Sequence, residues 1–174
     1  MDKQTKKTSI IKFVIPLAIL IAVAGIWILK NAEKDSQPTD GGDDFALHAT
    51  ESIDLERLKS YGLPIIIDFG ADSCAPCKEM APVLEELNSE LRGRAIIKFV
   101  DVWKYPELAE GYPISSIPTQ AFFDAKGKPF DPQNPVGLRL RRYANEEGEQ
   151  FMTVHVGGMT KEQLLTVLEE MGME

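Results

Sequence analysis

Two cysteines, Cys74 and Cys77, are the residues of this 174-residue chain whose type and spacing most clearly allow chemistry. The chain contains no other cysteine, and two thiols separated by two residues can close into a reversible disulfide. The apolar run 65–69 before them predicts a strand, and residues 75–91 predict a helix. Cys74 would then lie at the helix N-terminus, where unpaired N–H groups and the helix dipole favour a thiolate. We therefore expect Cys74 to attack a disulfide and Cys77, one turn inside the helix, to resolve the mixed disulfide.

Two other uses of the cysteine pair agree less well with the sequence. A structural zinc site normally takes four Cys or His ligands, and only His48 and His155 could complete one, from distant segments without ligand-like spacing. A purely structural disulfide between these cysteines would close a very small loop and add little stability. Thiol–disulfide exchange is therefore the favoured interpretation.

A longer pattern around the cysteines resembles thioredoxin. Residues 65–87 have the sequence IIIDFGADSCAPCKEMAPVLEEL, residues 117–119 are IPT, and residues 156–158 are VGG before a final predicted helix. The resemblance extends over about residues 52–172, with one insertion. It implies a thioredoxin-like α/β fold, with a mixed central sheet and helices on both faces. It also implies a thiol:disulfide oxidoreductase whose redox-active group is its own Cys74–Cys77 disulfide, with no further cofactor and no metal.

The resemblance assigns two catalytic residues besides the cysteines. Asp68 matches the family's buried carboxylate beneath the second cysteine, which implies a raised pKa and a role as proton acceptor for Cys77, directly or through a water. The alternative for Asp68 is a carboxylate at a strand end in solvent. Lys98, in the predicted strand 95–100, matches a family lysine near that carboxylate. The alternative for Lys98 is a solvated strand residue.

A substrate-binding surface is also implied by the resemblance. Pro118 matches the family's cis-proline, so the loop formed by Ile117, Pro118 and Thr119 is expected to face the disulfide and to offer backbone groups to an extended substrate. Ala75 and Pro76, between the cysteines, complete the predicted substrate-binding set. Ala75 stands where the family has glycine.

The sequence departs from the family pattern around the thiols. Ser73 replaces the usual tryptophan before the first cysteine, and Gly70 stands where another aromatic residue is common. These changes predict a smaller and more polar surface near the disulfide. Trp103 and Tyr105 are candidates to line the substrate side of the site, with core packing or loop anchoring as the alternatives. No histidine lies between the cysteines, and such histidines are typical of oxidising members, so the resemblance favours a reductase.

An apolar stretch near the N-terminus predicts a membrane anchor. Residues 13–29 carry no charge, and residues 10–29 are long enough to cross a bilayer if the amine of Lys12 extends to the interface. Four lysines precede position 13, whereas acidic residues are frequent after position 30. The positive-inside rule therefore predicts a cytoplasmic segment 1–9 and a domain on the extracytoplasmic side. Residues 22–24, AVA, resemble a signal peptidase site, and cleavage there is the alternative to a retained anchor.

The rest of the chain is predicted to form a tether and one domain. Residues 30–44 are polar and rich in Gly, Pro and Asp, which is typical of a flexible linker. Residues 45–174 suffice for a single hydrophobic core, and they form the predicted thioredoxin-like domain. The net charge of −8 argues against nucleic acid binding.

Within the domain, helical and strand patterns alternate, as a mixed sheet requires. Ser52 is the expected cap of a short helix that ends at Gly62, and residues 160–163 form a capping box before the final helix. Besides the strand at 65–69, strands are expected at 95–100, 120–124 and 151–156.

One insertion stands out, because residues 128–150 replace what would be a tight hairpin turn. This segment contains Arg139, Arg141 and Arg142 beside Tyr143, followed by several glutamates. It predicts either an extended, solvated hairpin with balanced charge or a docking surface for a membrane partner or anionic headgroups.

These features together predict a membrane-tethered, extracytoplasmic thioredoxin-like oxidoreductase that reduces disulfides of exported proteins. By resemblance, the electron donor would be a polytopic membrane protein, and apocytochrome c is one candidate substrate. Two alternatives remain open. One is a disulfide oxidase or isomerase on the same fold, and the other is a non-catalytic module whose CxxC pair grips a ligand or handles a metal.

Overall fold

The computed structural model describes residues 44–133 and 137–174. The predicted cytoplasmic segment 1–9, the predicted membrane anchor 10–29 and all but the last residue of the predicted linker 30–44 lie outside the described residues. In the part that the structure describes, none of the helices has the length and apolar character needed to span a bilayer.

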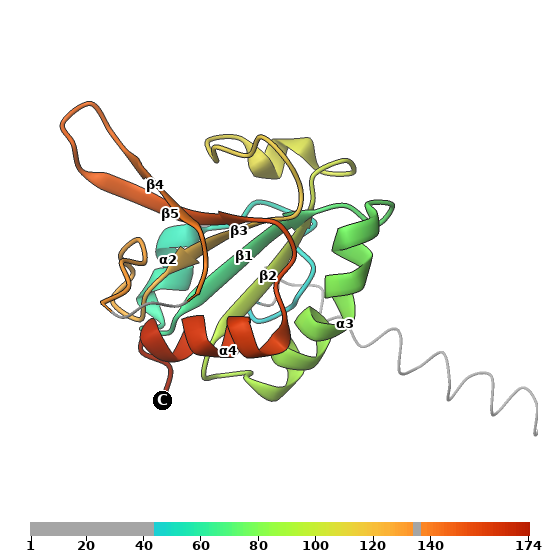
Figure 1. Cartoon of the computed structure of the whole chain (residues 1–174), viewed down its shortest axis with the longest axis horizontal. Helices are drawn as coiled ribbons and strands as arrows, with labels where there is room; N and C mark the ends of the chain where they lie inside the picture. Colours follow the sequence, from blue (N-terminus) through green and yellow to red (C-terminus); the bar gives the residue numbers. More distant parts are fainter. Residues whose placement is uncertain (1–43, 134–136) are drawn as a thin grey trace, which may run out of the picture. The chain divides into compact units, whose positions relative to one another are not determined.

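A five-stranded mixed sheet forms the centre of the compact unit Gly41–Glu174 (Figure 1). The strands are β1 (Ile65–Gly70), β2 (Ile96–Asp101), β3 (Thr119–Phe123), β4 (Leu140–Ala144) and β5 (Gln150–Val156). They follow the order β2-β1-β3-β5-β4, in which β1 and β2 are parallel and the other neighbouring pairs are antiparallel. The predicted mixed sheet is therefore confirmed.

Helices cover both faces of this sheet, as predicted. They are α2 (Leu55–Ser60), α3 (Ala75–Glu90), the 3-10 helix η1 (Pro106–Ala109) and α4 (Lys161–Glu170). One hydrophobic core joins α3 and α4 to sheet residues that include Ile66, and the other joins α2 to sheet residues that include Ile65 and Ile67. Because successive side chains of a strand point to opposite faces, β1 contributes to both cores, which explains its unbroken run of isoleucines.

One of the two predicted helix caps is confirmed, and the other is wrong. The capping box of α4 is present, since the Thr160 side chain accepts from the Gln163 backbone and the Gln163 side chain accepts from the Thr160 backbone. The predicted cap of α2 at Ser52 is wrong. Asp54 caps this helix, and its carboxylate accepts a hydrogen bond of 3.0 Å from the backbone N–H of Arg57. The helix begins later than predicted because that carboxylate satisfies an N–H group of its first turn.

Part of the insertion forms strand β4, whose residues the sequence analysis did not assign to a strand. Strand β4 pairs with β5, and the resulting hairpin extends away from the body of the domain (Figure 1). Leu140 and Tyr143 are half-buried, whereas Arg141 and Arg142 between them are exposed. This pattern lacks the strict alternation that identifies a strand, and the β4–β5 register shifts at Tyr143 and Ala144. The exposed hairpin was one of the two predicted forms of this segment.

Candidate active site

The two cysteines lie at the junction between β1 and α3. Cys74 is the N-cap residue of α3, and its carbonyl accepts a hydrogen bond of 3.0 Å from the backbone N–H of Lys78. Cys74 and Cys77 are joined in a disulfide whose Cα atoms are 5.3 Å apart. Cys74 is 9% exposed and Cys77 is 3% exposed, so Cys74 is the more accessible sulfur. This difference agrees with the predicted roles of Cys74 as attacking thiol and Cys77 as resolving thiol.

The predicted substrate loop lies against the disulfide. Ile117 packs against a small cluster formed by Ala71 and the two cysteines. The Ile117–Pro118 peptide bond is cis, as the resemblance implied, and the Pro118 carbonyl accepts from the backbone N–H of Gly157 at 2.9 Å.

The other predicted substrate-binding residues differ in accessibility. Ala75 and Pro76 are exposed at the start of α3, where a substrate can reach them. Thr119 is buried, and its hydroxyl donates a hydrogen bond of 2.7 Å to the carbonyl of Ser116. The Thr119 side chain therefore stabilises the shape of the loop. It is not itself accessible to a substrate.

Asp68 lies in the interior of the domain, which excludes the alternative of a solvated carboxylate at a strand end. Its side chain is 1% exposed, and this burial raises the pKa of Asp68 to about 7, although a hydrogen bond from Gln120 acts in the opposite direction. Gln120 Nε2 donates to Asp68 Oδ1 at 2.8 Å, while Asp68 Oδ2 has no hydrogen-bond partner among the described residues. One carboxylate oxygen therefore remains available to accept a proton.

The available oxygen of Asp68 and the resolving sulfur both lie next to Gly70. A Cβ atom built on Gly70 would lie 3.4 Å from Asp68 Oδ2 and 3.3 Å from Cys77 Sγ. Both atoms thus border the same small space beside Gly70. This arrangement allows proton transfer between Cys77 and Asp68 directly or through one bridging water.

Gln120 is a site residue that the sequence analysis missed. It lies on β3 directly opposite Asp68 in the antiparallel register, and its side chain is fully buried. A buried polar residue within the apolar strand Thr119–Phe123 is the one signal that could have indicated its role. The sequence does not reveal the register that brings it to Asp68.

The predicted position of Lys98 beside Asp68 is wrong. Lys98 pairs with Ile67 in the β1–β2 register, and its Nζ donates a hydrogen bond of 2.8 Å to the Ala46 carbonyl. Phe99 pairs with Asp68, and its ring borders the space beside Gly70 that Asp68 Oδ2 also borders. Because side chains alternate along a strand, Lys98 points to the opposite face of the sheet from Phe99. The position beside Asp68 belongs to Phe99, one residue later than predicted. In a strand, a shift of one residue moves a side chain to the opposite face of the sheet.

A cavity of about 180 Å³ reaches the resolving cysteine. Its lining includes Cys77, Ala81 and Leu84 from α3, together with Leu47, His48 and Phe99. This cavity offers water a route to the neighbourhood of Cys77. Within residues 44–133 and 137–174, no group of three or more His, Cys, Asp or Glu side chains is arranged to hold a metal ion.

Gly70 is required by the packing of Phe99 rather than by an unusual backbone angle. A Cβ atom at this position would lie 2.8 Å from Phe99 Cε2, closer than carbon atoms can approach without movement. We expect Gly70→Ala to lower the free energy of unfolding by about 1–3 kcal/mol, because a buried ring on β2 must shift. Chemical denaturation measures this change. Gly158→Ala is the matched control, since a Cβ there meets no atom within 4 Å, and an equal loss in both variants would contradict the explanation.

The geometry defines a class of protein. A disulfide at the N-terminus of a helix that follows a central strand, a cis-proline loop against it and a buried carboxylate beneath it are the site of a thioredoxin-like thiol:disulfide oxidoreductase. The thioredoxin family model matches residues 50–141, and the chain belongs to the thioredoxin family. The redox-active disulfide serves this activity without a separate cofactor.

Two sequence relatives agree with this assignment. A thioredoxin-like protein of Synechocystis is 40% identical over 74 residues, which cover 42% of this chain and 70% of the relative. Thioredoxin of Rickettsia felis is 32% identical over 78 residues, which cover 45% of this chain and 74% of the relative. Among solved structures, chloroplastic thioredoxin z aligns with a TM-score of 0.46 and 24% identity, over 70% of this chain and 92% of that one.

Proposed function

We propose that the chain is a membrane-tethered reductase whose thioredoxin-like domain faces the extracytoplasmic side and reduces disulfides of exported proteins. The activity itself rests on the juxtaposition of the Cys74–Cys77 disulfide with the available oxygen of Asp68. The tether is supported by the uncharged residues 13–29 and the four lysines before them. The reducing direction is supported by the absence of histidine between the cysteines.

In the proposed reaction, the Cys74 thiolate attacks one sulfur of a substrate disulfide and releases the other as a thiolate, which takes a proton from solvent. A mixed disulfide between Cys74 and the substrate results. Cys77 then transfers its proton to Asp68 Oδ2, directly or through a water, and attacks Cys74 Sγ. The second substrate sulfur leaves as a thiolate, which takes a proton from solvent, and the Cys74–Cys77 disulfide forms. Two electrons have moved from the protein to the substrate.

The pKa of Asp68 suits this proton transfer at neutral pH. Because burial raises the pKa of Asp68 to about 7, the carboxylate and the carboxylic acid are both populated near pH 7. The group can therefore take the proton of Cys77 and later return it to solvent. A carboxylate with an ordinary pKa would be a weaker proton acceptor for a thiol.

The two electrons must be restored after each cycle. Soluble cytoplasmic reductases cannot reach a domain across the membrane, so the proposed donor is a polytopic membrane protein with a dithiol of its own. Exported proteins with disulfides are the proposed acceptors, and apocytochrome c is one of them. A reduction potential measured against glutathione tests the direction, since about −270 mV fits a reductase whereas about −120 mV would assign an oxidant.

Limited proteolysis tests the tether. Protease added to intact cells, with any outer envelope removed, should release the domain by cutting between residues 31 and 44, because this segment is polar and precedes the predicted domain 45–174. The released domain should reduce small disulfides at the rate of the full chain, but it should be reduced more slowly by its membrane donor, since tethering raises effective concentration. Release only from permeabilised cells would place the domain in the cytoplasm.

A further inference from the structure

The loop after β2 lies beside the loop that carries the attacking cysteine. Gly70 and Asp101 are register partners at the ends of the parallel strands β1 and β2, and the Val102 N–H donates to the Gly70 carbonyl at 2.9 Å. Both strands end at the same edge of the sheet. The two loops that follow, one with Asp72 and the other with Trp103, therefore begin next to each other.

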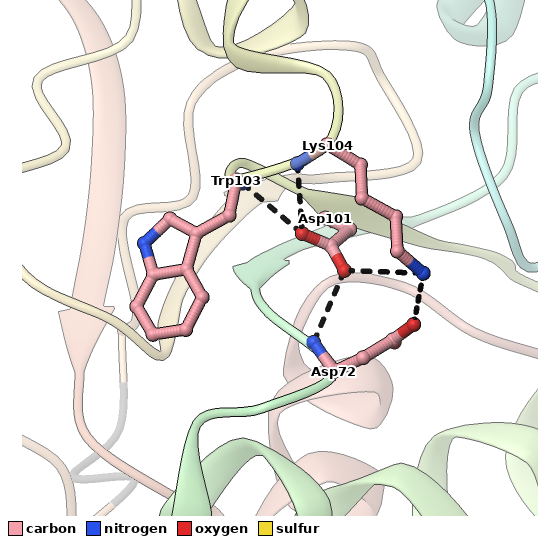
Figure 2. Close-up of polar contacts among 4 residues, drawn as sticks. All are labelled: Asp72, Asp101, Trp103 and Lys104. Carbon is pink, nitrogen blue, oxygen red and sulfur yellow. Dashed lines mark hydrogen bonds and ion pairs between the residues drawn. The ribbon is translucent and has the colours of Figure 1, made fainter.

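One carboxylate joins the two loops. Asp101 Oδ2 accepts a hydrogen bond of 3.1 Å from the Asp72 N–H, while Oδ1 accepts from the N–H groups of Trp103 at 3.0 Å and Lys104 at 3.1 Å (Figure 2). The Lys104 amine forms an ion pair with Asp72 (Figure 2). Burial acts to raise the pKa of Asp101, but the hydrogen bonds from these backbone groups outweigh it and lower the pKa. The carboxylate therefore stays charged and holds both loops.

Trp103 presents its indole to solvent from this fixed backbone. Its side chain points away from the ion pair (Figure 2), and the residue is 62% exposed. The other large exposed aromatic residues of the described part each have a ring neighbour, since Tyr61 contacts Phe45 and Phe151 contacts Tyr143. No ring contact of Trp103 occurs among the described residues. The backbone of Trp103 is therefore already held in place, and only its side chain is ordered when a substrate binds.

The two residues that precede the attacking cysteine provide no apolar side chain. Asp72 and Ser73, the two residues before Cys74, are exposed and polar, and Ala75 after it is small. A polypeptide substrate bound there gains a further, large apolar contact by reaching Trp103 on the adjacent loop. Tryptophan is also the side chain most enriched among residues that dominate binding energy.

We propose that Trp103 is a specificity-determining residue, and that it binds an aromatic or branched apolar side chain close to the reacting cysteine of a polypeptide substrate. The inference rests on the oxidoreductase activity of the Cys74–Cys77 pair, and it holds whichever direction the reaction takes in the cell. Trp103 acts on binding of the substrate, and it takes no part in the transfer of electrons or protons.

Single-turnover kinetics test this role with a common leaving group. Two synthetic peptides carry one cysteine as a mixed disulfide with thionitrobenzoate and differ only in having Phe or Gly two residues after it. The reduced Cys77→Ser variant attacks either peptide through Cys74 and releases thionitrobenzoate, which is followed by its absorbance. We expect the Phe peptide to react about 10-fold faster than the Gly peptide, as one well-buried aromatic contact provides. In Trp103→Ala this ratio should fall to about 1, and Trp103→Phe should restore most of it.

Phe151→Ala is the matched control, because it removes another exposed aromatic residue from the distant end of β5. It should leave the Phe/Gly ratio unchanged. A ratio near 1 before any change at Trp103, or a ratio that Trp103→Ala does not alter, would overturn the proposal. Failure of the tethering or reductase proposals would affect neither ratio, since this reaction needs only the attack by Cys74.

Fluorescence gives a second measurement. In a Trp27→Phe background, Trp103 is the one remaining tryptophan of the chain. Trapping the Phe peptide on Cys74 should shift the Trp103 emission to shorter wavelength, and trapping the Gly peptide should shift it less. Equal shifts for both peptides would contradict the proposal. A shift with phosphatidylglycerol vesicles and none with the Phe peptide would assign the indole to a lipid surface instead.

Discussion

Replacing Cys74 with serine should reduce disulfide exchange to the level measured without protein, whereas replacing Cys77 with serine should make the protein accumulate mixed disulfides with its substrates. Cys74 is the more accessible sulfur and lies at the start of α3, so it is the thiol that can begin the attack. Cys77 is nearly enclosed, and its part is to displace the substrate from Cys74. Insulin reduction measures the first effect, and non-reducing electrophoresis with mass spectrometry measures the second.

The double variant Cys74→Ser/Cys77→Ser is the control for trapping by other routes, and it should capture nothing. Equal capture by the two single variants would show that the sulfurs have interchangeable roles. Capture by Cys74→Ser alone would reverse the assignment. Applied in the native membrane, the Cys77→Ser variant would also identify the substrates that the proposed function requires.

Replacing Asp68 with asparagine should stabilise the protein, and the gain should grow with pH. The pKa of Asp68 is about 7 in the folded protein and 3.8 for an ordinary carboxyl, so the folded state holds the proton more tightly than the unfolded state. The contribution of protonated Asp68 to the free energy of unfolding is therefore fully present below pH 3.8. It is lost as the pH rises through about 7. The difference amounts to about 4 kcal/mol between about pH 4 and pH 8. The Asp68→Asn variant does not ionise and avoids this loss.

Denaturation of wild type and variant across that pH range measures the effect. Glu79→Gln is the matched control, because Glu79 is exposed on α3 and its replacement also removes one carboxylate. The control should show no comparable pH-dependent gain. A loss of several kcal/mol in Asp68→Asn at about pH 8 would show that the buried carboxylate is stabilised by contacts that asparagine cannot make.

The same variant should resolve mixed disulfides more slowly. The variant lacks the carboxylate that is proposed to accept the proton of Cys77, so the rate of resolution should fall by about 100-fold, the lower end of the range for a positioned base. The wild-type rate should rise with pH through about 7 as Asp68 ionises, and the variant should lack this rise. The attack of Cys74 on a substrate should change much less. Stopped-flow measurements that separate the two steps would detect an equal effect on both, which would argue against a role in resolution.

Local sequence patterns were sufficient to predict the elements that carry the site. The strand before Cys74, the helix that begins after it, the cis bond before Pro118 and the capping box at Thr160 are all present. Each depends on residues that are close together in the chain or on a motif that the resemblance supplied. The burial of Asp68 could also be predicted, since three isoleucines precede it in β1.

Features that depend on contacts between distant segments could not be predicted in this way. The pairing of Asp68 with Gln120 follows from the β1–β3 register, which neither strand specifies alone. The register of β2 places Phe99 beside the site, and Lys98 then points to the opposite face of the sheet. Likewise, the sequence allows Trp103 to be a core or loop-anchoring residue, whereas in the structure its side chain is exposed and Asp101 holds its backbone.

The division has a physical cause. A helix start, a turn or a thiol pair is stabilised by hydrogen bonds and dihedral preferences within a few residues, so the chain specifies it locally. The partner of a strand is chosen by the packing of whole faces, and a shift of one residue exchanges those faces. The sequence therefore determined that a reversible disulfide stands at the start of a helix. The tertiary structure alone decided which carboxamide, which aromatic ring and which neighbouring loop surround it.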